Sequence, residues 1–167
     1  MLKTLEDVLA YSRVGGALHR ERLSLLAVTA EAARDLGVDL GPSSGIFCDD
    51  AQLFADSVQL RLLLQNLLAN ALNYRSPERE LKVTVGADAS EQGMTVIVAD
   101  NGVGISPADR KRAMEPLVRL NRAGDGPGTG LGLATCRRIA QAHGGELEIR
   151  DAPGGGASIS VLFRREP

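Results

Sequence analysis

Two spacings of apolar residues alternate along the chain. Leucine, valine and alanine recur every three or four positions over residues 2–36, 57–74 and 130–143. This spacing predicts helices that each bury one face. Gly15 and Gly16 interrupt the first segment, so we expect two helices there rather than one.

Short apolar runs between these segments predict strands. The runs "ELKVTVGA" and "GMTVIVAD" are separated by a polar turn and predict a hairpin of buried strands. Two further strands, "ELEIRD" and "ASISVLF", are joined by "APGGG". We expect shorter strands in "GIFC" and just before the helix that Asp56 or Ser57 caps. The run "SPADRKRA" predicts a short helix with Ser106 as its cap and Pro107 first.

Composition favours a soluble globular domain. The 167 residues, 44% of them hydrophobic, fit one domain with a real core. A net charge of −2, 3% aromatic residues and no tryptophan argue against a nucleic-acid partner. The sequence has neither the roughly 18 consecutive apolar residues of a membrane segment nor the apolar core of a signal peptide. We expect a cytoplasmic domain in which Cys48 and Cys136 stay reduced.

One face of the predicted helix 57–74 carries three amides. Asn66, Asn70 and Asn73 share this face, opposite the leucines. Asparagine is a poor helix former because its amide competes for backbone hydrogen bonds, and solvated faces usually carry Glu, Lys and Gln instead. A carboxamide oxygen is a neutral ligand suited to Mg²⁺. We therefore interpret this face as a ligand site rather than a solvated surface.

Two glycine-bearing turns are further candidates for a site. The strand "VIVAD" ends in Asp100, and the chain then turns through Gly102 and Gly104. This carboxylate can accept a hydrogen bond from an exocyclic amine such as that of adenine, or it can cap its own turn. The stretch "GDGPGTGLGL" (124–133) opens the last helix, where backbone N–H groups attract anions. It matches neither a Walker A loop nor a dinucleotide-binding fingerprint.

Four motifs in order give the most specific evidence. The stretches "NLLANALNY", "DNGVGI", "MEPLVRL" and "GTGLGLATCRRIAQAHGGELEI" resemble the N, G1, F and G2 boxes of the ATP-binding catalytic domain of sensor histidine kinases. This domain belongs to the GHKL group of ATP-binding folds, and the resemblance covers roughly residues 40–164. Upstream, "LEDVLAYSRV" resembles the second helix of that family's dimerisation and phosphoacceptor hairpin.

The resemblance implies ATP and Mg²⁺ as ligands and gives roles to individual residues. Asn70 matches the asparagine that holds Mg²⁺, Asn66 matches the one that supports the phosphates, and Tyr74 matches the ring beside the adenine. Asp100 matches the aspartate that accepts a hydrogen bond from the adenine amine. The other residues that it places around the base are Gly102, Gly104 and Ile105.

The same resemblance implies a lid over the phosphates. Arg119 matches a lid arginine aimed at the phosphates, and Arg122 assists it. We expect Asn66 and Arg119 to be the catalytic residues. The glycine-rich stretch matches the hinge of the lid and the phosphate cradle, which explains its backbone freedom. Its predicted nucleotide-binding residues are Gly128, Thr129, Gly130, Leu131, Gly132 and Leu133.

Three positions depart from the family pattern. Asn73, still a predicted nucleotide-binding residue, stands where the family usually has a lysine or arginine, so we expect one neutral phosphate contact. Met114 and Leu117 replace aromatic residues of the F box, so we expect the lid to dock more loosely. The magnesium and adenine residues are retained, and nucleotide binding is therefore expected to survive.

Neither histidine matches the family's phosphoacceptor. His143 ends the last helix, which is a structural position in the family. His19 begins "HRERLSL", which lacks the acid and the proline of an acceptor motif and lies too close to Asn70 for the rest of a hairpin. We interpret this stretch as a linker, and we expect the chain to begin inside the second hairpin helix, with the acceptor histidine outside it.

Together these observations predict an α/β two-layer sandwich, in which a mixed sheet of about five strands carries three helices on one face, plus an N-terminal helical stub. We expect a stub and linker over residues 1–36 and an ATP-binding catalytic domain over 37–167. The expected activity is transfer of the γ-phosphate of Mg-ATP to a histidine of the parent chain or another chain, with a response regulator downstream and a homodimer formed through the first helix. The alternatives are an anti-sigma-factor-type serine kinase and a nucleotide-binding regulatory pseudokinase.

Overall fold

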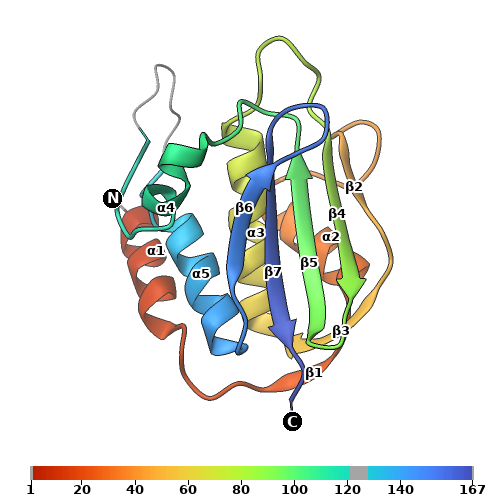
Figure 1. Cartoon of the computed structure of the whole chain (residues 1–167), viewed down its shortest axis with the longest axis vertical. Coiled ribbons are helices and arrows are strands. Elements are labelled where there is room, and N and C mark those ends of the chain that lie inside the picture. The colour runs from red at the N-terminus through yellow and green to blue at the C-terminus, as the bar shows by residue number, and fades with distance from the viewer. Residues whose placement is uncertain (1, 121–127, 167) are drawn as a thin grey trace.

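The computed structural model describes residues 2–120 and 128–166, which fold into two layers (Figure 1). One layer is a five-stranded sheet in the order β2-β4-β5-β7-β6. Strand β2 runs parallel to β4 and the other neighbours are antiparallel, so the sheet is mixed, as predicted. Its strands are β2 (Ile46–Cys48), β4 (Val83–Ala89), β5 (Gly93–Asp100), β6 (Leu147–Asp151) and β7 (Ala157–Arg164).

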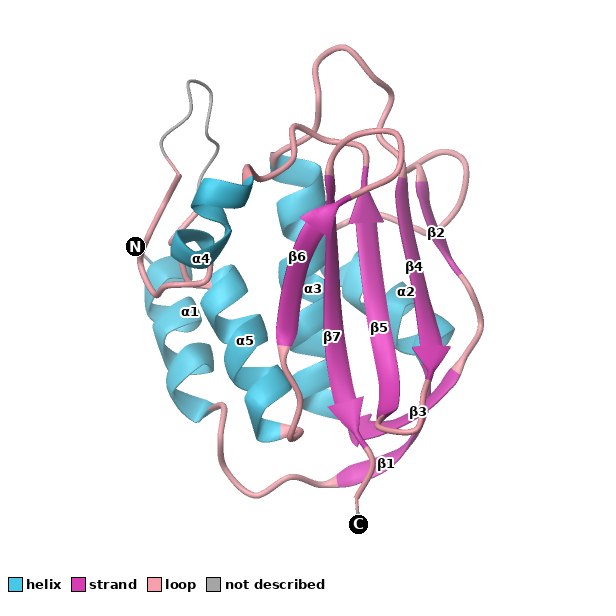
Figure 2. Cartoon of the chain, in the orientation of Figure 1, coloured by secondary structure: helices cyan, strands magenta, loops and turns pink. Residues whose placement is uncertain are grey.

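Helices form the second layer, on one face of this sheet (Figure 2). The long central helix packs against a helix on each side, and its predicted leucine stripe is fully buried from Leu60 to Leu68. The architecture predicted from the sequence is therefore confirmed. The helices are α1 (Leu2–Arg13), α2 (Leu25–Asp35), α3 (Ser57–Asn73), α4 (Arg110–Ala113), which follows a 3-10 turn (Pro107–Asp109), and α5 (Gly132–Ala142).

Asp56 and His143 tie the start of α3 to the end of α5. The Asp56 carboxylate caps α3 by accepting from the backbone N–H of Gln59 at 3.0 Å. The Asp56 backbone N–H donates to Nε2 of His143 at 3.1 Å, and Nδ1 of His143 donates to the carbonyl of Ile139 at 2.9 Å. Burial lowers the pKa of His143. The ring is therefore a neutral, fully satisfied structural group, in agreement with the interpretation of this histidine from sequence.

A second sheet joins β1 (Arg20–Ser24) to β3 (Gln52–Asp56) in antiparallel register. The sequence predicts a linker here, and this prediction is only partly correct: His19 lies in an extended connection, but the next five residues form β1. Charged residues dominate this strand, so it has no apolar run, and its partner is distant in sequence. Helix α2 begins only after Ser24, whose hydroxyl accepts from the N–H of Ala27 at 3.1 Å.

The hydrophobic core continues across residue 36, where the sequence predicts a boundary between two parts. Leu25, Ala32 and Ala33 of α2 are fully buried, and α2 packs against α3 and the sheet. Helix α1 differs, because none of its described residues is buried. Val14, directly after α1, is the first described residue to enter the core.

Both cysteines, Cys48 and Cys136, are free thiols. Cys136 is fully buried in the core, and burial strongly raises the pKa of its thiol. Within the described residues, no helix is both long enough and apolar enough to cross a membrane.

Candidate functional site

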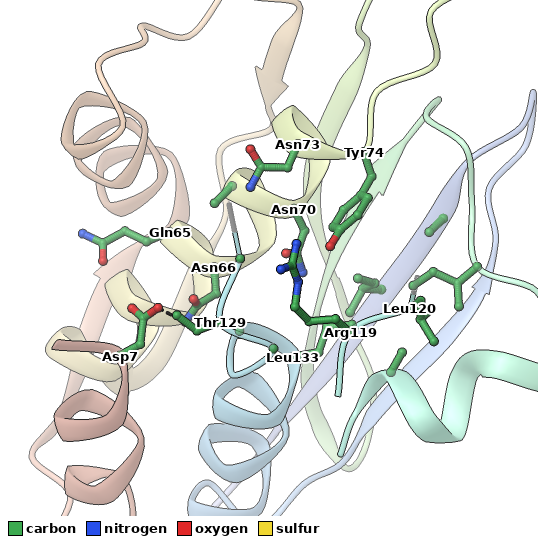
Figure 3. A pocket seen from close by; sticks show the side chains of 18 of the residues that line it. Asp7, Gln65, Asn66, Asn70, Asn73, Tyr74, Arg119, Leu120, Thr129 and Leu133 are labelled. Carbon is green, nitrogen blue, oxygen red and sulfur yellow. Dashed lines mark hydrogen bonds between the residues drawn. The ribbon is translucent and has the colours of Figure 1, made fainter. Parts of the chain in front are cut away.

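A cavity of about 310 Å³ lies where α3, the start of α5 and the end of β5 meet (Figure 3). Most predicted nucleotide-binding residues line it, although they come from separate stretches of the sequence. Of the others, Gly102 lies in the turn after β5, Leu131 is buried in the chain just before α5, and Arg122 lies outside the described residues. The predicted residues in the lining are Asn66, Asn70, Asn73, Tyr74, Asp100, Gly104, Ile105, Arg119, Gly128, Thr129, Gly130, Gly132 and Leu133.

The amide face of α3 meets the N-terminus of α5. A Cβ added to Gly132, the first residue of α5, would lie 3.4 Å from Oδ1 of Asn66 and 3.8 Å from Oδ1 of Asn70. No side chain in the described part of the chain caps α5 at its start. The first backbone N–H groups of α5 therefore lie beside two amides with no capping side chain, an arrangement that favours an anion such as phosphate.

Asp100 occupies another wall of the cavity. Its Oδ1 accepts from the backbone N–H of Gly102 at 2.9 Å and from that of Ala157 at 3.3 Å. Within the described part of the chain, Oδ2 accepts no hydrogen bond from the protein. Burial raises the pKa of this carboxyl, and the two N–H donors oppose the change. One oxygen therefore fixes the turn, while the other is left for a ligand donor such as an amine.

Two close backbone contacts, each at a glycine, restrict the turn at Asp100. A Cβ on Gly102 would lie 2.3 Å from the carbonyl oxygen of Tyr74, and one on Gly156 would lie 2.0 Å from that of Asp100. Arg79 holds the same turn by donating to the carbonyl of Gly102 at 2.8 Å and to that of the preceding residue at 2.9 Å. The sequence analysis missed Gly156 and Arg79 because their importance depends on a contact between loops.

The predicted lid segments contact each other beside the cavity. The backbone N–H of Leu117 donates to the carbonyl of Gly130 at 2.9 Å. Gly130 has a φ of +76°, and a Cβ there would lie 2.8 Å from the carbonyl carbon of Leu117. Arg119 extends from this contact into the cavity (Figure 3). Of the two replaced F-box aromatics, Met114 packs against the core and Leu117 is 66% exposed.

Part of the lining comes from α1 and α2, which the sequence analysis did not assign to the site. Lys3 and Asp7, four residues apart on α1, both line the cavity, and Asp7 Oδ2 accepts from the Thr129 hydroxyl at 2.8 Å. Asp35 lies at the end of α2, where a bidentate hydrogen bond with Arg61 lowers the pKa of its carboxyl to about 2. A spacing of four residues on a predicted helix places Lys3 and Asp7 on one face, and this signal could have grouped them.

The donor set fits a nucleotide-borne Mg²⁺ better than a metal held by protein side chains alone. Among the described residues, no cluster of three or more histidine, cysteine, aspartate or glutamate side chains could hold a metal ion. The cavity instead offers the amide oxygens of Asn66 and Asn70. Mg²⁺ prefers oxygen ligands and usually keeps several waters and substrate phosphates, so one amide oxygen is a sufficient protein contribution.

Comparison with known proteins settles the family. Residues 55–167 match the family described as "Histidine kinase-, DNA gyrase B-, and HSP90-like ATPase". The chain belongs to this family. The resemblance to histidine-kinase ATP-binding domains inferred from the four motifs is thereby confirmed.

Individual relatives agree with this assignment. The chain is 35% identical over 136 residues to the virulence sensor protein BvgS of Bordetella bronchiseptica, covering 79% of this chain and 11% of that protein. It is 35% identical over 146 residues to the adaptive-response sensory kinase SasA of Parasynechococcus marenigrum, covering 84% and 38%. The chain therefore spans well under half the length of these relatives.

Solved structures share the fold. The ATP-binding domain of PrrB from Mycobacterium tuberculosis matches with a TM-score of 0.66 at 22% identity, covering 89% of this chain and 98% of that one. Full-length ShkA in complex with AMPPNP matches with a TM-score of 0.74 at 27% identity, covering 99% of this chain and 36% of that one.

Proposed function

We propose that the cavity binds Mg-ATP with the adenine against Asp100 and the phosphates between the amides of α3 and the start of α5. The observation that carries this proposal is the convergence of the four motifs on one cavity. Asp100 presents an acceptor to the adenine amine from a half-buried position, and Asn66 and Asn70 lie beside the uncapped N-terminus of α5. The carboxylate suits the adenine amine, and the amides beside a helix N-terminus suit the phosphates, so the two groups match the two parts of a nucleotide.

The residues of this chain promote phosphoryl transfer by positioning the phosphates and by balancing their negative charge. Asn70 would hold Mg²⁺, which would neutralise charge on the phosphates. Asn66 and the α5 N–H groups orient the phosphate chain, and Arg119 supplies a guanidinium in the cavity. Asn66 is an amide and not a carboxylate, so it cannot act as a base for an attacking water. The γ-phosphate is thus reserved for a nucleophile that enters from outside the cavity.

The nucleophile is a histidine of another chain or of another part of the parent chain. Its imidazole nitrogen attacks the γ-phosphorus, the bond to the β–γ bridging oxygen breaks, and ADP leaves with that oxygen. Neither histidine in the chain fits this role: His143 is fully buried with both nitrogens bonded. His19 is exposed in an extended connection rather than on a helix. A response regulator then receives the phosphoryl group.

We further propose that the catalytic domain begins near Gly15 and Gly16 rather than at residue 36, because β1 and α2 share its core. Helix α1 then belongs to the preceding hairpin. In this proposal its exposed apolar residues form a homodimer interface; they are Leu2, Leu5, Val8 and Leu9. Use of Mg-ATP implies a cytoplasmic site of action.

A nucleotide-binding regulatory pseudokinase is the second candidate. Asn73 lines the cavity as a neutral amide, so one cation is missing from the phosphate region relative to the family pattern. The resemblance of "LEDVLAYSRV" to the second hairpin helix of histidine kinases and the "HGG" that ends α5 favour a histidine kinase over an anti-sigma-factor-type serine kinase.

Titration calorimetry with Mg-ATP, followed by incubation with γ-labelled ATP, tests these proposals. We expect micromolar to millimolar binding and no acid-labile phosphate on the chain alone. Label should appear on an added hairpin protein that carries an acceptor histidine from a sensor kinase. Binding without transfer to any acceptor would favour the pseudokinase. Label on the chain alone that disappears in His19→Ala would overturn the assignment of the acceptor to another segment, and absence of any ATP binding would overturn the function itself.

A further inference from the structure

Helix α1 is held against the rest of the molecule mainly by polar contacts. None of its described residues is buried. At its C-terminal end, Arg138 of α5 donates to the carbonyl of Tyr11 at 2.8 Å and stacks over the Tyr11 ring at 4.5 Å. In its middle, Asp7 accepts from the Thr129 hydroxyl at 2.8 Å. Because burial of apolar surface is the main stabilising contribution to such packing, little of it holds α1 in place.

The second of these contacts lies at the cavity. Asp7 and Thr129 both line it, and Figure 3 shows their hydrogen bond beside Asn66. Thr129 also precedes Gly130 in the predicted phosphate cradle. A hydroxyl has one proton to donate, so Thr129 cannot give the same hydrogen bond to Asp7 and to a phosphate oxygen.

We infer that Asp7 sets the affinity of the cavity for charged nucleotides and couples nucleotide binding to the docking of α1. The carboxylate opposes the negative charge of the phosphates and holds the Thr129 hydroxyl in the ligand-free protein. A bound triphosphate repels Asp7 and competes for Thr129, so it loosens α1. By linkage, movement of α1 away from the cavity raises affinity for the nucleotide by the same factor. The inference rests on the proposed binding of Mg-ATP in this cavity.

Other charged groups around the cavity do not replace Asp7 in this role. Lys3 lies one turn earlier on α1 and also lines the cavity, but its side chain is exposed. Asp35 has a guanidinium partner in Arg61, which also forms an ion pair with Glu31. Asp100 lies at the base end, in the proposed orientation. Asp7 is therefore the carboxylate that faces the proposed phosphate region and has no guanidinium partner among the described residues.

Substitution of Asp7 by asparagine isolates the charge. In Asp7→Asn, the amide oxygen can still accept from Thr129, so α1 keeps its contact and only the negative charge is lost. Glu6→Gln is the matched control: it removes the same charge from the neighbouring, exposed position, which does not line the cavity. Calorimetry with Mg-ATP and with adenosine separates the effect on phosphates from any effect on the base.

We expect Asp7→Asn to bind Mg-ATP about threefold to tenfold more tightly than the wild-type chain, as one charge within a few ångströms in partly screened surroundings implies. Adenosine affinity should be unchanged, and Glu6→Gln should behave as wild type. Unchanged or weaker Mg-ATP binding in Asp7→Asn, or an equal gain for adenosine, overturns the inference. A wild-type chain that binds no nucleotide at all would instead remove the proposed function, and the two failures are thus distinguishable.

Amide hydrogen exchange of residues 2–13 tests the coupling itself. Saturating Mg-ATP should speed exchange in α1 of the wild-type chain, and the increase should be smaller in Asp7→Asn because less repulsion is relieved. Adenosine should leave α1 unchanged in both. Exchange in α1 that does not respond to Mg-ATP in the wild-type chain overturns the coupling.

Discussion

The substitution Asp100→Asn tests base recognition at the point where the structure is most specific. Oδ1 of Asp100 accepts from two backbone N–H groups, those of Gly102 and Ala157. An asparagine must keep its oxygen in that position, because both neighbours are donors. Its NH₂ group therefore replaces Oδ2 and faces the adenine amine, so that a donor meets a donor.

The magnitude follows from the lost hydrogen bond. A hydrogen bond to a charged group contributes about 1.5–3 kcal/mol, which corresponds to about a tenfold to 150-fold rise in Kd for ATP. Inosine triphosphate carries a carbonyl oxygen where adenine carries its amine. The new NH₂ group can donate to that oxygen, so affinity for this nucleotide should be unchanged or higher.

Titration calorimetry of both nucleotides against wild type and variant measures the difference, and the midpoint of thermal unfolding is the control for folding. Because Oδ1 keeps both backbone contacts, the midpoint should move by only a few degrees. Equal losses for ATP and inosine triphosphate in a folded variant would refute the assignment of Asp100 to the adenine amine.

Three further changes have defined outcomes. Asn70→Ala should lower ATP affinity in Mg²⁺ to the value measured in EDTA, with a smaller loss in Asn73→Ala; a retained magnesium dependence in calorimetry would contradict the metal assignment. Gly130→Ala should cost about 1–3 kcal/mol of unfolding free energy and weaken ATP binding, because φ is +76° and the facing carbonyl carbon lies 2.8 Å from the new Cβ. Gly16→Ala should do neither, because Gly16 does not line the cavity and a Cβ there would meet only a backbone oxygen 4.0 Å away. Burial lowers the folded-state pKa of His143 below its unfolded value near 6.5, so below that pH the unfolded chain binds a proton that the folded chain does not. Urea unfolding should therefore show stability falling from pH 7.5 to 5.5 by at most about 1.4 kcal/mol per pH unit, and a flat profile would show that this ring is not held neutral.

The exposure of α1 also bears on the proposed homodimer. Its apolar residues are exposed, and Leu5 has 58% of its surface accessible. Covering these residues with a second copy would fix α1 in place, and the Asp7 contact would then transmit its position to the nucleotide. In the proposed coupling, a change in the position of α1 would therefore alter the affinity of the cavity for the nucleotide.

The sequence by itself determined the elements that have a strong local signal. The leucine stripe of α3, the hairpin β4–β5 and a cap at Asp56 or Ser57 follow from spacing and from capping chemistry, which act within a few residues, and the structure identifies Asp56 as the cap. The four motifs also identified the family and most residues of the cavity. Such residues are recognisable because their side chains are unusual where they stand, as amides on a helix face or a carboxylate at a strand end.

Tertiary structure alone decided what depends on contacts between distant segments. Strand β1 has no apolar run and exists because its backbone pairs with β3. Arg79 and Gly156 matter because loops far apart in sequence converge under Asp100. Asp7 joins the cavity because α1 packs beside α5. In each case the deciding interaction is a hydrogen bond or a steric restriction between segments that are distant in sequence. A pattern of neighbouring residues does not encode such an interaction.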